Sequence, residues 1–282
     1  MHKMNGKIKS VLWFFLLMLL CVLFFLTTQF QRQSPDNFEP RTVGRIVIAP
    51  SVLLSLYGGD RYLASNMEVI RVAATGVDQG RVDTGYLVRA QIVAADLNPC
   101  NEDNYYLANG LLAWGGADDD AGVVLQKAMS CRFWDPVPAF FYGFNRAFFH
   151  KDISGAEQAL ELAAKRSSDN AFSFRKLAIM LRAESIADEN LALDFLINQR
   201  DAAGDAKLRD VLDKRVVRLK GLVTLRDAQR EFEAEYGSLS SLEQLVESNI
   251  LQFLPEDPLK LGYEMRDGRV SLKRLKIAGM EE

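Results

Sequence analysis

The sequence predicts a mainly α-helical protein: an N-terminal transmembrane helix, an α-helical repeat region and a small α+β module at the C-terminus. Three observations predict it. One apolar run near the N-terminus is uninterrupted, and most of the remaining chain carries apolar residues at three- and four-residue spacing. Near the C-terminus, two alternating segments flank Asp267-Gly268. With 49% apolar and 25% charged residues, the composition is that of a folded globular protein.

The first element is the apolar run over residues 11–26, which has no polar interruption. With Ser10, Thr27 and Thr28 it would form about 28 Å of helix, close to the about 30 Å of a hydrocarbon core. We therefore expect a transmembrane helix over residues 10–30. The alternative is a cleaved signal peptide, but the run leads into Thr27-Thr28-Gln29-Phe30 rather than a small-x-small cleavage site.

Charge predicts the orientation of this anchor. Lys3, Lys7 and Lys9 precede the run, so residues 1–9 are expected to be a cytoplasmic tail, with the bulk of the chain across the membrane. The absence of Asn-x-Ser/Thr sequons fits a bacterial periplasm, which gives a single-pass inner-membrane protein with a signal-anchor. Residues 31–50, with Pro35 and Pro40, are expected to be a juxtamembrane linker.

The exported part is acidic. Beyond residue 30 the chain has 31 basic and 37 acidic residues. A net negative surface repels phosphate backbones, so we expect no nucleic-acid partner.

Residues 51–228 are predicted to form the helical repeat domain, because helix-length segments follow one another there with short breaks. Such breaks favour antiparallel helix pairs. The expected helices are Ser51–Tyr57, Asp60–Ala74, Asp83–Leu97, Glu102–Trp114, Asp118–Cys131, Pro136–Lys151, Ser154–Lys165, Phe172–Ala183 and Asp188–Asn198.

A pattern of small and large apolar residues repeats in this region, at a period of 35 or 36 residues. The recurring set is Ala121, Leu125 and Ala128, then Ala156, Leu160 and Ala163, then Ala192 and Leu196, with Gln199 breaking the third match. A period near 34 is that of the tetratricopeptide repeat. Asn104-Tyr105-Tyr106-Leu107-Ala108 resembles its first helix, and Asp135-Pro136 its closing proline. Residues 100–200 therefore resemble tetratricopeptide repeats, although the usual Trp and Gly are not in position. The alternative is a non-repetitive helical array.

Two cysteines lie in the exported part. Cys100 begins one expected helix and Cys131 ends the next, so the two ends of an antiparallel hairpin would bring them together. A disulfide closing this loop would stabilise the fold by roughly 3–4 kcal/mol in the chain-entropy model. Two buried free thiols are the alternative.

Residues 229–282 are predicted to be a C-terminal helix plus β-hairpin module. A long helix over Asp205–Glu235 leads into it, and Gly237 is a plausible C-cap. Ser240 and Glu243 form a candidate capping box for a short helix over Leu242–Ser248. Tyr263–Arg266 and Arg269–Leu272 alternate around Asp267-Gly268, which predicts a hairpin.

The order of these elements resembles the C-terminal part of type II secretion and type IV pilin-like proteins. No prepilin Gly-Phe-x-x-x-Glu precedes the apolar run, so the chain is not itself expected to be a pilin. The module would otherwise serve only as a cap for the helical array.

Catalytic motifs are missing from the sequence. The chain has two histidines, His2 and His150, and no cluster with metal-ligand spacing. We expect no cofactor, no metal and no catalytic residue; Asp118-Asp119-Asp120 is interpreted as the acidic start of a helix. An enzyme built on paired carboxylates stays open, because such acids need only be close in space.

The aromatic segment around residues 133–149 supplies the candidate binding residues. Phe140, Phe144 and Phe148 lie one turn apart and are expected to face the core. In tetratricopeptide folds the first helix of each pair lines a concave groove. The resemblance therefore implies a partner-binding groove at Asn109, Tyr142, Asn145, Arg146 and Phe149. The alternative is ordinary packing against the neighbouring repeat.

These observations predict a membrane-anchored helical-repeat scaffold or adaptor that binds protein partners in an envelope assembly, such as a secretion, pilus or surface-polymer system. One alternative is an envelope enzyme, or enzyme subunit, with its site in the helical groove. A second is a structural subunit whose anchor, with Trp13 and Cys21, contacts other membrane helices.

Overall fold

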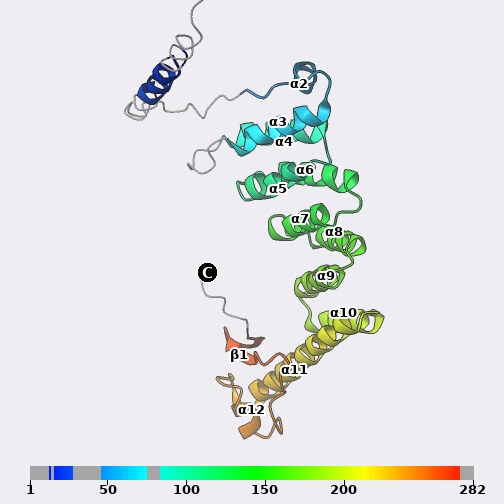
Figure 1. Ribbon diagram of the computed structural model, residues 1–282. Helices are drawn as coiled ribbons and strands as arrows, with labels where there is room; N and C mark the ends of the chain where they lie inside the picture. Colours follow the sequence, from blue (N-terminus) through cyan, green and yellow to red (C-terminus); the bar gives the residue numbers. More distant parts are fainter. Residues whose placement is uncertain (1–12, 14–15, 28–45, 75–82, 274–282) are drawn as a thin grey trace, which may run out of the picture. The chain divides into compact units, whose positions relative to one another are not determined.

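The computed structural model describes residues 13, 16–27, 46–74 and 83–273, and the chain divides into two units, residues 1–45 and 46–282 (Figure 1). Within the first unit, residues 13 and 16–27 are helical. No helix in the described part of the chain combines the length and apolar character needed to cross a membrane.

The transmembrane helix expected over residues 10–30 is therefore contradicted. The described helical residues 16–27 rise only about 18 Å, well short of the about 30 Å of a hydrocarbon core. The other residues of that segment (10–12, 14–15 and 28–30), the tail 1–9 and linker residues 31–45 lie outside the described residues.

The second unit is mostly helical, as predicted, and consecutive helices pack against one another (Figure 1). Several bounds agree with the sequence prediction to within one or two residues. The helices are α2 (Pro50–Leu56), α3 (Arg61–Ala73), α4 (Thr84–Leu97), α5 (Glu102–Leu107), η2 (Ala108–Ala113), α6 (Asp118–Cys131), α7 (Val137–Phe148), α8 (Ile153–Arg166), α9 (Ala171–Ser185), α10 (Glu189–Ala202), α11 (Ala206–Tyr236) and α12 (Gln244–Glu247).

Acidic and amide side chains fix where many of these helices begin. Each accepts a hydrogen bond from a backbone amide of the first turn, which satisfies a donor that has no partner within the helix. These N-caps are Asp60, Asp83, Asn101, Asp152, Asp188 and Asp205.

The repeating small and large apolar residues all lie in the core. Every member of the set on α6, α8 and α10 is at most 5% exposed. Small side chains at these positions allow the neighbouring helix to approach, and the leucine one turn away fills the remaining space.

One expected helix differs in kind. The segment 102–114 begins as α5 and continues as the π-helix η2. The wider hydrogen-bonding of a π-turn inserts one extra residue and is often found at functional sites. Asn109, one of the predicted groove residues, lies in η2.

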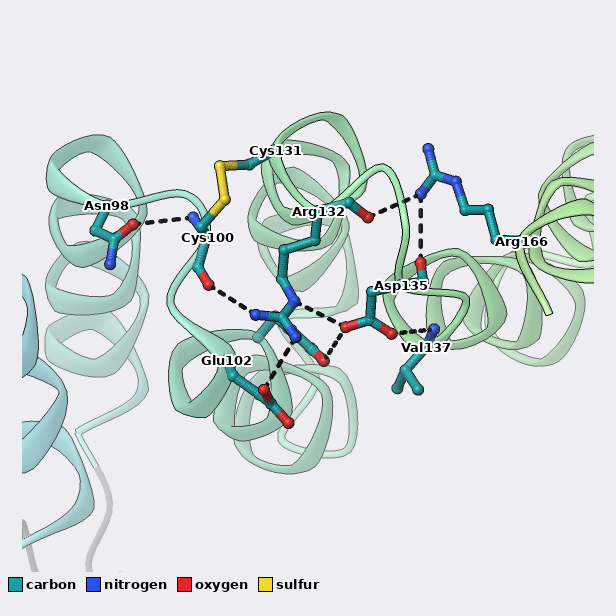
Figure 2. Close-up of polar contacts among 9 residues, drawn as sticks. Asn98, Cys100, Glu102, Cys131, Arg132, Asp135, Val137 and Arg166 are labelled. Carbon is teal, nitrogen blue, oxygen red and sulfur yellow. Dashed lines mark hydrogen bonds and ion pairs between the residues drawn. A yellow bond between two sulfur atoms is a disulfide. The ribbon is translucent and has the colours of Figure 1, made fainter. Parts of the chain in front are cut away.

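A disulfide and a cluster of hydrogen bonds around one arginine link helices α5, α6 and α7 (Figure 2). Cys100 and Cys131 are bonded, with their Cα atoms 5.3 Å apart. The adjacent Arg132 donates to Glu102 at 3.0 Å, to the Cys100 carbonyl at 3.3 Å and to Asp135 at 2.8 Å.

Asp135 is the centre of this cluster. Its carboxylate accepts hydrogen bonds from the Val137 amide at 2.9 Å, from Arg132 and from the buried Tyr105 hydroxyl at 2.8 Å. Burial alone would raise the pKa of Asp135, but these three donors hold it below its usual value. Arg166 of α8 donates to the Arg132 and Asp135 carbonyls, so α8 joins the same cluster (Figure 2).

The C-terminal part packs on α11, which runs without a break across residues 228 and 229. Strands β1 (Tyr263–Arg266) and β2 (Arg269–Leu272) form the predicted antiparallel hairpin, with Met265 opposite Val270. The turn residues Asp267 and Gly268 both have positive φ, as a two-residue hairpin requires.

Two local predictions for this part fare differently. Gly237 follows the last residue of α11, as expected, and its φ of 87° is one that glycine adopts readily, although its ψ of −164° is not that of a left-handed cap. The capping box does not form as predicted: Gln244, not Glu243, accepts from the Ser240 amide at 2.9 Å, and the short helix α12 begins only at Gln244.

A buried ion pair fixes the loop before β1 to α11. Arg218 and Asp257 have side chains only 6% and 4% exposed, with 3.0 Å between Nε and Oδ2. Asp257 also accepts from the amides of Leu259, Leu261 and Gly262. Arg218 donates to the carbonyl of Lys273 at 2.7 Å.

Candidate partner-binding surface on helix α7

Helix α7 buries its small residues rather than its phenylalanines. Ala139 and Gly143 are buried, and a Cβ on Gly143 would lie 3.0 Å from Leu160 Cγ and 3.1 Å from the Ala156 carbonyl. Because α8 approaches this closely, no large side chain fits between the two helices.

Of its phenylalanines, Phe141 packs against the core of α3–α6, and the other three lie on another side of α7. Phe140, Phe144 and Phe148 stack along it, with ring centroids 6.4 Å and 5.7 Å apart. Phe148 is 48% exposed and the other two are half-buried. The prediction that all three face the core is therefore wrong, because the small residues Ala139 and Gly143 form the face of α7 that packs against α8.

Aromatic rings from neighbouring helices extend the row of three phenylalanines. Phe174 of α9 lies 5.2 Å from Phe140, and Trp114, which follows η2, lies 5.3 Å from Phe148. Trp114 is 59% exposed. We call Phe140, Phe144, Phe148, Trp114 and Phe174 the aromatic face. Its residues come from three successive hairpins of the helical array.

A basic group flanks the aromatic face at Phe148. The Lys151 ammonium lies 5.5 Å from the Phe148 ring centroid. A cation held over this exposed ring adds positive charge to the apolar surface.

Three of the predicted groove residues lie on the side of α7 that faces away from the aromatic face. Tyr142, Asn145 and Arg146 line a pocket of about 110 Å³ between α6 and α7, which we call the polar pocket. The Asn145 amide donates to Asn109 Oδ1 at 3.1 Å, and the Tyr142 hydroxyl accepts from Gln126 at 2.8 Å. The structure thus brings four of the five predicted residues together.

Phe149, the fifth predicted residue, is not part of the polar pocket. Its ring packs edge-on against Trp114 at 5.3 Å, beside the aromatic face.

Charged side chains complete the polar pocket. His150 Nε2 lies 2.9 Å from Asp118 and 3.7 Å from Asp119. Arg146 donates twice to Asp152, which raises the pKa of Arg146. The Gly155 amide and then Arg146 lower the pKa of Asp152. Asp118 and Asp119 lie in the acidic first turn of α6, as predicted.

Sequence reasoning missed the contact between His150 and Asp118. The two residues are far apart in sequence, but α6 begins where α7 ends because the helices are antiparallel. The available signal was His150 directly after α7, together with the acidic first turn of the preceding helix α6.

Catalytic geometry is not evident in the described part of the chain. Its buried carboxylates, Glu68, Asp135 and Asp257, each pair with an arginine rather than with one another. No group of three or more metal-binding side chains is found among the described residues.

Comparison with known proteins adds no relative: no family model, curated protein or solved structure matches the chain.

Proposed function

We propose that this protein is a tetratricopeptide-like adaptor that binds a partner polypeptide on its aromatic face. The single observation behind the proposal is that Phe140, Phe144 and Phe148 of α7 lie outside the core clusters, partly exposed, with Trp114 beside them. Exposed aromatic side chains on rigid helices are typical binding hot spots. Keeping them in contact with water has a cost that a partner would remove.

The partner is a segment with apolar side chains and acidic charge. Apolar groups pack on the rings, and an acidic group faces Lys151. The predicted groove residues have a supporting role in this proposal, because Asn109, Asn145 and Arg146 hold α7 against η2 and α8.

An envelope assembly in an oxidising compartment is the proposed setting. The support is the bond between Cys100 and Cys131, because such bonds persist mainly outside the cytosol.

The test is photo-crosslinking in the producing cells. A photoreactive phenylalanine analogue replaces Phe148 in the full chain; a matched control replaces Val217, which is 45% exposed on α11. We expect one discrete adduct from position 148 and not from position 217. The captured protein, once purified, should bind the wild-type chain, and Phe148→Ala should weaken that binding at least about tenfold.

The proposal fails if position 148 gives no adduct, or if both positions give the same set. It also fails if the purified captured protein binds Phe148→Ala as tightly as wild type. Circular dichroism of the variant separates lost contact from lost folding.

A further inference from the structure

A second candidate site lies where the helical array meets the C-terminal module. A pocket of about 210 Å³ opens between the end of α9, α10, α11 and strand β2. Its floor is apolar and includes the buried Ala183, Ala192 and Leu196, with Leu219 and Leu272 beside them. We call it the junction pocket.

One guanidinium in the lining has no counterion. Arg215 is half-buried and forms no ion pair with any described residue. A guanidinium that is partly removed from water favours an anion, and its planar donors match a carboxylate.

The other two lining groups that could compete are already engaged. Arg218 is paired with Asp257 and donates to the Lys273 carbonyl. Glu189 forms ion pairs with Arg226 and Arg269. Arg215 is therefore the available cation of the pocket. The remaining charged residue, Glu184, is exposed and disfavours a second negative charge on a ligand.

We infer that the junction pocket binds the C-terminal residue of a partner polypeptide, with a large apolar side chain on the floor and the α-carboxylate on Arg215. A terminal residue carries both groups on one Cα, which matches an apolar floor with a single cation. The volume is below the about 300–1,000 Å³ of pockets for drug-sized ligands, so it suits one side chain rather than a long acyl chain.

The inference is independent of the aromatic face. The two surfaces share no residue, so failure of one proposal leaves the other intact.

The experiment measures fluorescence polarisation of a labelled peptide, Gly-Ser-Gly-Ser-Gly-Phe with a free C-terminus, against the full chain. The residues before Phe are uncharged because of Glu184. We expect binding of the free acid and loss of at least about tenfold in affinity for the C-terminal amide, since charge-assisted hydrogen bonds are lost. A peptide that ends in Ser with a free carboxylate should also bind at least about tenfold more weakly.

The matched variants are Arg215→Gln and Lys214→Gln. Both remove one positive charge from the same turn of α11, but Lys214 pairs with Asp210 and does not line the pocket. Arg215→Gln should reduce affinity for the free acid to that of the amide, while Lys214→Gln should bind like wild type.

Equal binding of acid and amide would overturn the inference, as would equal losses in the two variants. It is also overturned if dodecanoate displaces the peptide as effectively as unlabelled peptide does, because the ligand class would then be a free amphiphile. Failure to bind the Phe peptide at all has the same consequence.

Discussion

Replacing Asp257 with asparagine tests how the C-terminal module is held to α11. Asn keeps the shape of the side chain and one acceptor oxygen, but leaves the 6%-exposed Arg218 without a counterion. Removing one partner of a buried ion pair costs about 3–5 kcal/mol. Because most domains have only about 5–15 kcal/mol of net stability, the loss should be plain in urea unfolding followed by circular dichroism at pH 7.

The control is Asp227→Asn, which breaks an exposed pair with Arg230 on the same helix. Exposed pairs contribute about 0–1 kcal/mol, so the urea midpoint should barely move. Hydrogen exchange adds a local measurement: Asp257→Asn should accelerate exchange in residues 263–272 far more than in α8.

The effect of Asp257→Asn should depend on pH. Burial acts to raise the pKa of Asp257, but the backbone amides of Leu259, Gly262 and Leu261 and the Arg218 charge lower it overall. A carboxylate with a lowered folded-state pKa stabilises the fold above its unfolded pKa of about 3.9, and that contribution is lost as pH falls through the folded-state pKa. The gap between wild type and variant should therefore be full at pH 7 and narrow below about pH 4. A loss of less than about 1 kcal/mol at pH 7, or a gap unchanged at pH 3, would refute this account of the ion pair.

Two further changes test the packing around α7. Reducing the Cys100–Cys131 bond should lower the free energy of unfolding by about 3–4 kcal/mol, whereas dithiothreitol should not affect the Cys100→Ala/Cys131→Ala variant; identical midpoints for oxidised and reduced wild type would contradict this. Gly143→Leu should destabilise by about 1–3 kcal/mol because its side chain meets Leu160 and Ala156. Gly110→Ala, with open space around it, should instead gain up to about 1 kcal/mol, and equal melting temperatures for the two variants would exclude tight α7–α8 packing.

Helix positions and the hairpin were predictable because they depend on local signals. Apolar spacing located α4 and α6 to within a residue, a long charged stretch located α11, and Asp267-Gly268 defined the turn. The shift from α5 to η2 was not predictable from spacing, since an apolar pattern does not distinguish a π-turn from an α-turn.

The orientation of α7 was the main error within the second unit, and its cause is physical. This helix carries two stripes at helical spacing: the phenylalanines, and the small residues Ala139 and Gly143. Hydrophobicity favours burying the first, whereas close approach of α8 requires the second. Which row of residues is buried depends on the helix that packs against α7. The sequence of α7 alone therefore predicts the wrong buried face.

The cluster around Arg132 affects how cooperatively the helices of the second unit unfold. In a linear array, each unit contacts only its neighbours and can unzip from an end. Here the disulfide and the hydrogen bonds of Arg132 and Arg166 link α5, α6, the start of α7 and α8, all between residues 98 and 166. We therefore expect residues 98–166 to unfold together as one cooperative unit.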